Sequence, residues 1–254
     1  MPALLTAFEA IVAARRSADR FDPARSIPDA LLTRLCAATA RSPSGFNLQP
    51  YTVVLVRSPP ARQALSRAMI GRGNAARVEE APVTAVFAAD LRPLEGVAEV
   101  LAVEAAWGGR SGRYLRAMPT DAALLLGGGG CEAAGGRAAR TAAAALLSRV
   151  APGAMPTPSS PEAWAVKAAG LAAMTFMHAA AAAGLATHAM EGLDAGAVRA
   201  ACGIPQRYAI PLVVAMGYTP EQSDAHTQTP RLPLGALFRL DEWSSPWVAP
   251  QQGA

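Results

Sequence analysis

Continuous apolar runs alternate along this chain with segments in which apolar residues recur at helical spacing. The runs cover residues 51–57, 81–90 and 210–218, and each contains few polar residues. A strand that is buried on both faces has this composition, because neither face has to meet water. Helical spacing appears in residues 4–12 and again in residues 28–36, ahead of the first run. The alternation predicts a layered domain of the α+β or α/β class, with helices on both faces of a sheet.

Two more helices are expected from local signals. Residues 59–69 open with prolines, which suit the first turn of a helix. A long helix is predicted from Trp164 to Gly184, where the glycine is suited to end it. This segment contains Lys167 and His178 and is dominated by alanine, which favours a helix far more than it favours lipid. We therefore expect the long helix to be buried within a globule or a dimer, and we expect no membrane association.

The length and composition are those of a protein with a sizeable core. The chain has 254 residues, of which 52% are hydrophobic and 17% charged, so it fits one large domain or two small ones. We expect a single domain over residues 1–254, with a Gly/Ala/Pro-rich insertion or lid at about 108–161. The glycine run at 127–130 matches neither a phosphate loop nor a dinucleotide fingerprint and is interpreted as a linker. Trp243 and Trp247 would be costly to expose, so the C-terminal tail is expected to cover a partner subunit.

Charge and cysteine usage narrow the class of ligand. The net charge is +4, and the basic residues are scattered arginines apart from Lys167. Because no basic stripe is interleaved with aromatic residues, an anionic small molecule is favoured over nucleic acid. Cys36, Cys131 and Cys202 lie far apart and form no metal-ligand pattern, so we expect a reducing compartment and no metal site. Cys36 falls on the apolar face of a predicted helix and is expected to be a small core residue.

The N-terminal residues carry no basic segment ahead of an apolar run. We therefore expect a cytoplasmic location, with targeting to an organelle as the open alternative.

Four residues are candidates for binding a phosphate. Arg15, Arg16 and Ser17 follow the first predicted helix, and two guanidinium groups with a hydroxyl can hold a phosphate through charge-assisted bonds. Arg231 lies between prolines in a stiff loop that carries one cation. An arginine pair by itself is usually the solvated end of a helix, so these residues gain weight only together with other motifs.

Two further motifs suit the flat ring of a ligand. Asn74 and Arg77 are three residues apart and share one face if their segment is helical. An amide beside a guanidinium suits a heteroaromatic edge on which carbonyl and N–H groups alternate. Residues 188–194 read HAMEGLD, and Gly192 would let the backbone approach a ligand closely.

The segment RSPSGFNLQP, residues 41–50, places an irregular polar turn before a buried strand. Such a turn must satisfy its own backbone, and the carboxamides of Asn47 and Gln49 can do so. Two interpretations stay open at this point, a turn that binds a ligand and a turn that only satisfies itself.

Taken together, these motifs resemble the nitroreductase family of flavin oxidoreductases. In the family's order they are Arg15-Arg16-Ser17 with Phe21, SPSGFNLQPY, Asn74 with Arg77 before EEAP, GLATHAMEGLD, PLVVAMGY and RLPL. They span roughly residues 8 to 243, with residues 108–161 unmatched. The resemblance implies a three-layer α/β/α fold of the α+β class. Its central sheet is mixed but largely antiparallel and flanked by helices, and its C-terminal tail extends over a dimer partner.

The resemblance also implies that FMN is shared between the two subunits of a homodimer. Arg15 and Arg231 would bind the phosphate, and Arg16 and Ser17 the phosphate–ribityl region or the pyrimidine edge. Asn74 and Arg77 would read the pyrimidine ring. The residues implied to pack on the isoalloxazine are Ala189, Met190, Glu191, whose backbone N–H would face N5, and Gly192. Those implied to form the wall from the other subunit are Pro43, Ser44, Gly45 and Asn47. Phe46, Tyr114 and the lid are candidates for the substrate wall, although simple packing is the favoured interpretation of each.

One departure from the family's pattern concerns charge. The family commonly has a cation two positions after the serine, near flavin N1 and O2, whereas this chain has Asp19. A cation there stabilises the anionic reduced flavin, and a carboxylate disfavours it. Arg20 or Arg77 could supply the missing charge, or Asp19 could accept a hydrogen bond from N3–H. A second departure is Thr229, where relatives often carry lysine.

The function implied is a ping-pong transfer of hydride from NAD(P)H through flavin N5 to a small acceptor, which would be a nitroaromatic, a quinone or an activated alkene. No catalytic residue beyond the flavin is expected, because the cofactor supplies the chemistry. The alternatives on the same scaffold are a dehalogenase, an azoline-type dehydrogenase or a flavin-fragmenting enzyme. A non-catalytic flavin-binding protein and an alanine-rich scaffold without a ligand also remain open.

Overall fold

The computed structural model describes residues 2–126, 134–151, 153, 157, 159–220 and 229–248. The chain divides into two compact units, Met1–Ser223 and Asp224–Ala254. The single domain expected over residues 1–254 stays a prediction. The expected linker at 127–130 and Cys131 lie outside the described residues.

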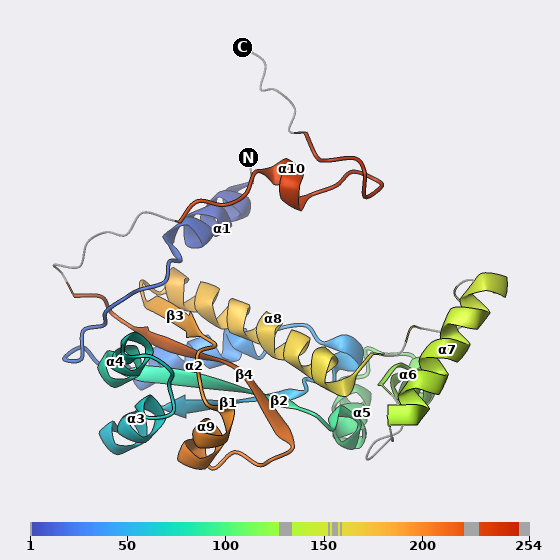
Figure 1. The fold of residues 1–254 in the computed structure, drawn as a ribbon, viewed down its shortest axis with the longest axis horizontal. Helices are drawn as coiled ribbons and strands as arrows, with labels where there is room; N and C mark the ends of the chain where they lie inside the picture. The colour runs from blue at the N-terminus through green and yellow to red at the C-terminus, as the bar shows by residue number, and fades with distance from the viewer. Residues whose placement is uncertain are drawn as a thin grey trace. The chain divides into compact units, whose positions relative to one another are not determined.

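A four-stranded sheet in the order β1-β2-β4-β3 forms the centre of the first unit, and every neighbouring pair is antiparallel (Figure 1). The strands are β1 (Tyr51–Val56), β2 (Val83–Asp90), β3 (Ala186–Met190) and β4 (Tyr208–Gly217). A parallel bridge between Ser17 and Thr187 adds one short extended segment at the outer edge of β3. The prediction of a mixed, largely antiparallel sheet is confirmed, and so are the three predicted strands.

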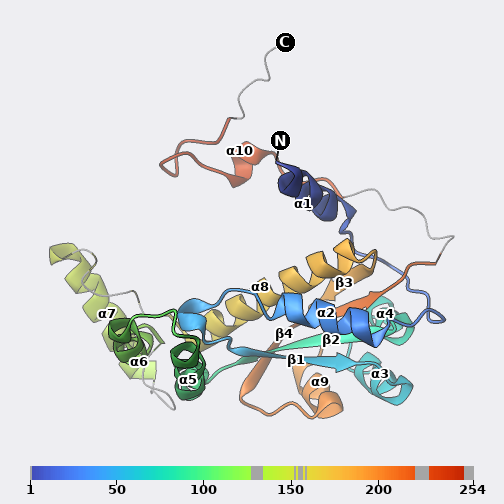
Figure 2. The same cartoon turned by 180° about the vertical axis from the view of Figure 1, so that it is seen from behind.

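Helices cover both faces of this sheet. Side chains of β2 alternate, so that Val83, Ala85 and Phe87 join one apolar cluster while Val86 and Ala88 join the other. The face with Phe87 is covered by α2 (Asp29–Thr39) and α8 (Pro161–Ala182), seen from both sides in Figures 1 and 2. The opposite face is covered by α3 (Pro59–Ser66), α4 (Arg72–Glu80) and α9 (Ala195–Cys202). These three layers confirm the predicted fold class.

The long alanine-rich helix α8 lies in the core. Ser160 caps its start by accepting a hydrogen bond from the Ala163 N–H at 3.1 Å, and Gly184 ends it with a φ of +73°. Within the described residues, α8 is the one helix whose length and hydropathy would suffice to cross a bilayer. One of its faces is buried, and Phe176 meets Phe87 edge to face at 6.0 Å. The expectation of a buried helix is confirmed.

Two predicted N-terminal helices are present, but their surroundings differ from expectation. Helix α1 (Ala3–Ala14) has no buried residue, and its Leu4 side chain is 86% exposed. In α2 the buried residues are Leu32, Leu35 and Thr39, and Cys36 is exposed. The prediction that Cys36 is a core residue is therefore wrong, because it lies to one side of the stripe that meets the sheet.

The region from residue 93 to residue 161 is largely helical. It contains α5 (Val97–Trp107), α6 (Gly112–Leu126) and α7 (Ala134–Val150), of which α6 and α7 fall in the expected insertion. Helix α6 packs Met118 and Ala122 against Leu48 and Trp164 in a small apolar cluster.

In the second unit, the chain reverses direction after α10 (Leu234–Leu237). The Trp247 N–H then donates to the Phe238 carbonyl at 2.9 Å. The covering of a partner subunit by this tail stays a prediction.

Candidate functional site

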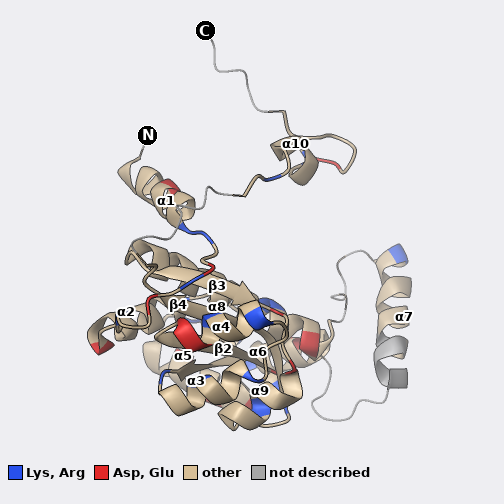
Figure 3. Cartoon of the chain, turned by 60° about the vertical axis from the view of Figure 1, so that its left-hand side comes forward, with Lys and Arg blue, Asp and Glu red and all other residues tan. Residues whose placement is uncertain are grey.

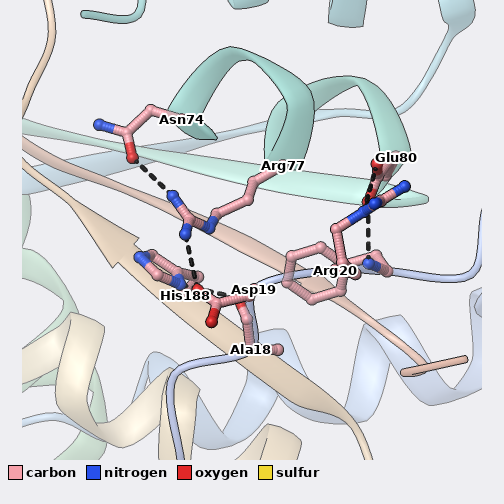
Figure 4. Close-up of polar contacts among 8 residues, drawn as sticks. Ala18, Asp19, Arg20, Asn74, Arg77, Glu80 and His188 are labelled. Carbon is pink, nitrogen blue, oxygen red and sulfur yellow. Dashed lines mark hydrogen bonds and ion pairs between the residues drawn. The ribbon is translucent and has the colours of Figure 1, made fainter. Parts of the chain in front are cut away.

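Three segments that are far apart in the sequence meet beside the edge strand β3. The chain leaves α1 at Arg15 and runs along β3, where the Ala18 N–H donates to the Thr187 carbonyl at 3.0 Å. One residue further, Nδ1 of His188 lies 2.7 Å from the Ala18 carbonyl oxygen. A carbonyl can only accept, so His188 donates from Nδ1. Figure 4 shows this segment facing the first turns of α4.

Helix α4 carries the amide and guanidinium pair. It begins after Gly71, whose φ of +87° suits a glycine, and the helical geometry places Asn74 and Arg77 on one face as predicted. One terminal nitrogen of Arg77 donates to Asn74 Oδ1 at 3.0 Å. The other donates to Asp19 Oδ1 at 2.6 Å (Figure 4).

Gly192 lets the segment after β3 approach this pair closely. Its carbonyl oxygen accepts from the Ile70 N–H at 2.8 Å, and Asn74 Nδ2 lies 3.5 Å from the same oxygen. A Cβ atom at position 192 would lie 2.9 Å from Asn74 Nδ2. The neighbour of Gly192 in the structure is thus the Asn74 side chain, and the approach of this backbone to a ligand stays a prediction.

The guanidinium of Arg77 is unusually enclosed for a surface helix. Its side chain is 18% exposed, whereas that of Asp19 is 54% exposed. The Nε atom of Arg77 is buried and has no hydrogen-bond partner among the described residues. Because an unsatisfied buried donor is costly, this atom points to a ligand at the site.

The surrounding charges are mixed. Burial is the main cause that lowers the pKa of His188, and nearby Arg77 acts in the same direction, while the Ala18 carbonyl and Asp19 oppose them. Arg20 pairs with Glu80, since its Nε donates to both carboxylate oxygens of Glu80 at 2.8 and 2.9 Å. Figure 3 shows basic and acidic residues interspersed over the first unit.

The remaining candidates of the first unit that flank this cluster differ in exposure. Arg15 and Arg16 are half-buried, and Ser17 is exposed. On β3 and just beyond it, Met190 is buried, while Ala189 and Glu191 are exposed. Since β3 is an edge strand, the main chain of this segment has one side that does not face β4.

Arg231 belongs to the second unit. Its guanidinium donates to the Thr229 carbonyl at 3.0 Å and to the Thr229 hydroxyl at 2.5 Å. Arg231, which was predicted to bind a phosphate, is therefore bonded to Thr229, and its binding of a ligand stays a prediction.

The turn over residues 41–50 lies at the other end of the sheet from α4 (Figure 1). It precedes Tyr51, which pairs with Ala89 near the end of β2, whereas α4 leads into Val83 at the start of β2. Six residues of strand separate these ends, which is about 20 Å. One chain therefore does not bring Pro43, Ser44, Gly45 and Asn47 together with Asn74 and Arg77.

The turn adopts a strained backbone that its own side chains support. Phe46, Asn47 and Gln49 have φ angles of 51°, 54° and 44°, which non-glycine residues rarely adopt. Ser44 Oγ accepts from the Gln49 N–H at 2.9 Å, and Gln49 Nε2 donates to Asn47 Oδ1 at 3.2 Å. Asn47 Nδ2 donates in turn to the buried Glu104 at 3.3 Å. Strain concentrated in this way is typical of functional segments.

An open groove of about 690 Å³ lies beside the turn, on the side away from α4. Its lining includes both carboxamides of the turn together with Asp90 and Arg207, which form an ion pair at 2.7 Å. The groove is thus separate from the cluster of Asn74 and Arg77 within one chain.

Phe46 and Tyr114 share one environment. Both are half-buried against the apolar cluster of Leu48, Met118 and Trp164, and the Arg110 guanidinium lies 4.9 Å from the Tyr114 ring centre. Their predicted part in a substrate wall remains a prediction.

Sequence reasoning missed three residues that shape these sites. His188 and Glu80 were quoted within motifs but given no role, and Glu104 was not considered at all. Glu80 fixes the segment after α1 by accepting from the Phe21 N–H at 3.1 Å. Its position in EEAP, directly before a strand, was the available signal.

Comparison with known proteins agrees with this geometry. Residues 12–218 match the sequence model of the nitroreductase family. A Thermus thermophilus protein named NADH dehydrogenase is 32% identical over 239 residues, covering 92% of this chain and 97% of that protein. The crystal structure of YdfN from Bacillus subtilis has a TM-score of 0.71 at 22% identity, covering 93% of this chain and 99% of that one. An FMN complex from Exiguobacterium sibiricum has a TM-score of 0.66 at 19% identity, covering 92% and 96%.

Proposed function

The chain belongs to the nitroreductase family, and from this premise we propose that it is an FMN-dependent oxidoreductase. It would pass hydride from NAD(P)H to a small acceptor by a ping-pong mechanism. The acceptor would be a nitroaromatic, a quinone or an activated alkene. Two similar proteins support this proposal. One is named NADH dehydrogenase, and the crystal structure of the other contains FMN.

The observation that carries the proposal is the convergence of Asn74, Arg77 and Gly192 beside β3. The Asn74 carboxamide both donates and accepts, and the buried Arg77 Nε adds a donor without a partner in the described residues. A flavin pyrimidine ring presents alternating carbonyl and N–H groups, so these side chains fit its edge. Gly192 leaves room for the Asn74 carboxamide to lie close to the main chain of this segment.

Other residues would bind and orient the cofactor. Arg15, Arg16 and Arg231 would hold its phosphate and side chain. When bound, FMN supplies the hydride-accepting and hydride-donating centre. The chain's own groups would set the ring's position and charge, and we infer no general acid or base among them.

A second subunit would complete the site. The turn at residues 41–50 lies about 20 Å from Asn74 within one chain, yet it carries strained residues and lines an open groove. We propose that a homodimer brings the turn of one subunit to the flavin held by the other. The exposed apolar face of α1 is available for such an assembly. The same proposal includes a cytoplasmic location.

The test is an absorbance spectrum of the purified protein before and after anaerobic addition of NADH or NADPH. We expect FMN absorption that bleaches with either nucleotide and returns when an acceptor is added. Arg77→Gln should lose most bound FMN. Arg72→Gln removes an exposed arginine from the same helix and should retain FMN. A colourless protein that takes up no added FMN would overturn the proposal, and a bound flavin that stays oxidised would favour the non-catalytic binder.

A further inference from the structure

Asp19 forms an ion pair with Arg77, the guanidinium that the proposed function places at the flavin edge. Of the three nitrogens of Arg77, one bonds Asn74, one bonds Asp19 at 2.6 Å, and Nε is buried without a partner among the described residues (Figure 4). With the Arg77 side chain only 18% exposed, water screens this ion pair less than it screens a pair on an open surface.

Resting on the proposed function, we propose that Asp19 lowers the midpoint potential of the bound flavin by neutralising Arg77. Reduction of FMN adds two electrons and one proton, and it leaves negative charge on the pyrimidine side of the ring. A cation held there stabilises the reduced form, and a carboxylate paired with that cation cancels most of the effect. The reduced cofactor is then a stronger hydride donor than it would be beside an unpaired arginine.

Two neighbours of the ion pair leave it intact. Arg20 pairs with Glu80. The imidazole of His188 also lies near Asp19 and Arg77. Its pKa is lowered, so the ring is neutral at pH 7.5. The ion pair at 2.6 Å is therefore the contact through which Asp19 acts on the charge of Arg77.

The experiment is an anaerobic redox titration of the full-length, FMN-loaded protein against a reference dye at pH 7.5. We expect Asp19→Asn to raise the midpoint potential of the bound flavin by about 30 mV. For a two-electron couple this shift corresponds to an about tenfold higher ratio of the affinity for reduced flavin to the affinity for oxidised flavin. Asp22→Asn is the matched control, because Asp22 lies in the same segment and its carboxylate accepts from the Ala24 N–H at 2.9 Å. The Asp22→Asn variant should change the same affinity ratio by less than about twofold.

An unchanged or lower potential in Asp19→Asn, with FMN still bound and reduced by NAD(P)H, would overturn this inference and leave the proposed function standing. A tenfold loss of affinity for oxidised FMN in Asp19→Asn would also overturn it, because Asp19 would then contact the ring itself. A wild-type protein that binds no FMN would overturn both proposals.

Discussion

Replacing Gly192 by alanine tests whether the close approach at β3 shapes the site. The added Cβ would lie 2.9 Å from Asn74 Nδ2, nearer than real Cβ contacts, and 3.6 Å from the Ile70 carbonyl oxygen. The backbone at Gly192 has no positive φ, so alanine adds no conformational strain there. The Asn74 carboxamide is the part that can move, and it would have to turn away from Arg77.

The size of the effect follows from the contacts that Asn74 gives up. Its Nδ2 donates to the Ile70 carbonyl at 3.1 Å, and its Oδ1 accepts from Arg77 at 3.0 Å. Each such bond contributes about 0.5–1.5 kcal/mol, so the folded protein should lose about 1–3 kcal/mol of stability. FMN should lose a similar set of contacts with Asn74. We expect its dissociation constant to rise about 10- to 100-fold, since 1.4 kcal/mol is tenfold.

The assay is quenching of FMN fluorescence in a titration of apoprotein, together with thermal unfolding. Gly96→Ala is the control, because nothing lies within 4 Å of a Cβ atom at that position. Unchanged FMN affinity in Gly192→Ala would refute the placement of the flavin edge at Asn74.

Three further changes test other parts of the account. Arg231→Ala should weaken FMN binding by about 1.5–3 kcal/mol through loss of a charge-assisted phosphate contact, measured by equilibrium dialysis, and unchanged binding would remove Arg231 from the site. The folded pKa of His188 lies below its ordinary 6.5, so the unfolded chain binds more protons and stability falls as the pH drops below 6.5. Between pH 7.5 and 5.5 the free energy of unfolding of His188→Gln should therefore fall less than that of the wild type, measured by urea unfolding, and equal losses would argue against this role. Gly45→Ala places a Cβ 2.9 Å from the ring of Trp164, a residue that is 3% exposed. The substitution should lower the free energy of unfolding by about 1–3 kcal/mol and change the Trp fluorescence. Wild-type stability would contradict this contact.

The sequence predicted those elements whose burial is continuous along the chain. The runs that became β1, β2 and β4 are apolar on both faces and needed no knowledge of their partners. Strand β3 was missed because ATHAM is short, contains a histidine and lacks a run of branched apolar residues. Its pairing with β4 and the bridge at Ser17 define it as a strand, and both are tertiary contacts.

The site shows the same division between local and long-range information. Helical spacing was enough to place Asn74 and Arg77 on one face, and the glycine after β3 indicated a close approach. The partner of Asp19 was left open between alternatives, because Asp19 and Arg77 are 58 residues apart in sequence. Cys36 was misplaced because a periodic stripe does not fix which edge of the helix meets the sheet.

A crystal structure of the FMN-loaded protein tests the central claim most directly. The account predicts a flavin whose pyrimidine edge contacts Asn74 and Arg77 of one subunit, with Asn47 supplied by the other subunit. A flavin bound elsewhere, or one reached by the turn and by Asn74 of the same chain, would contradict it.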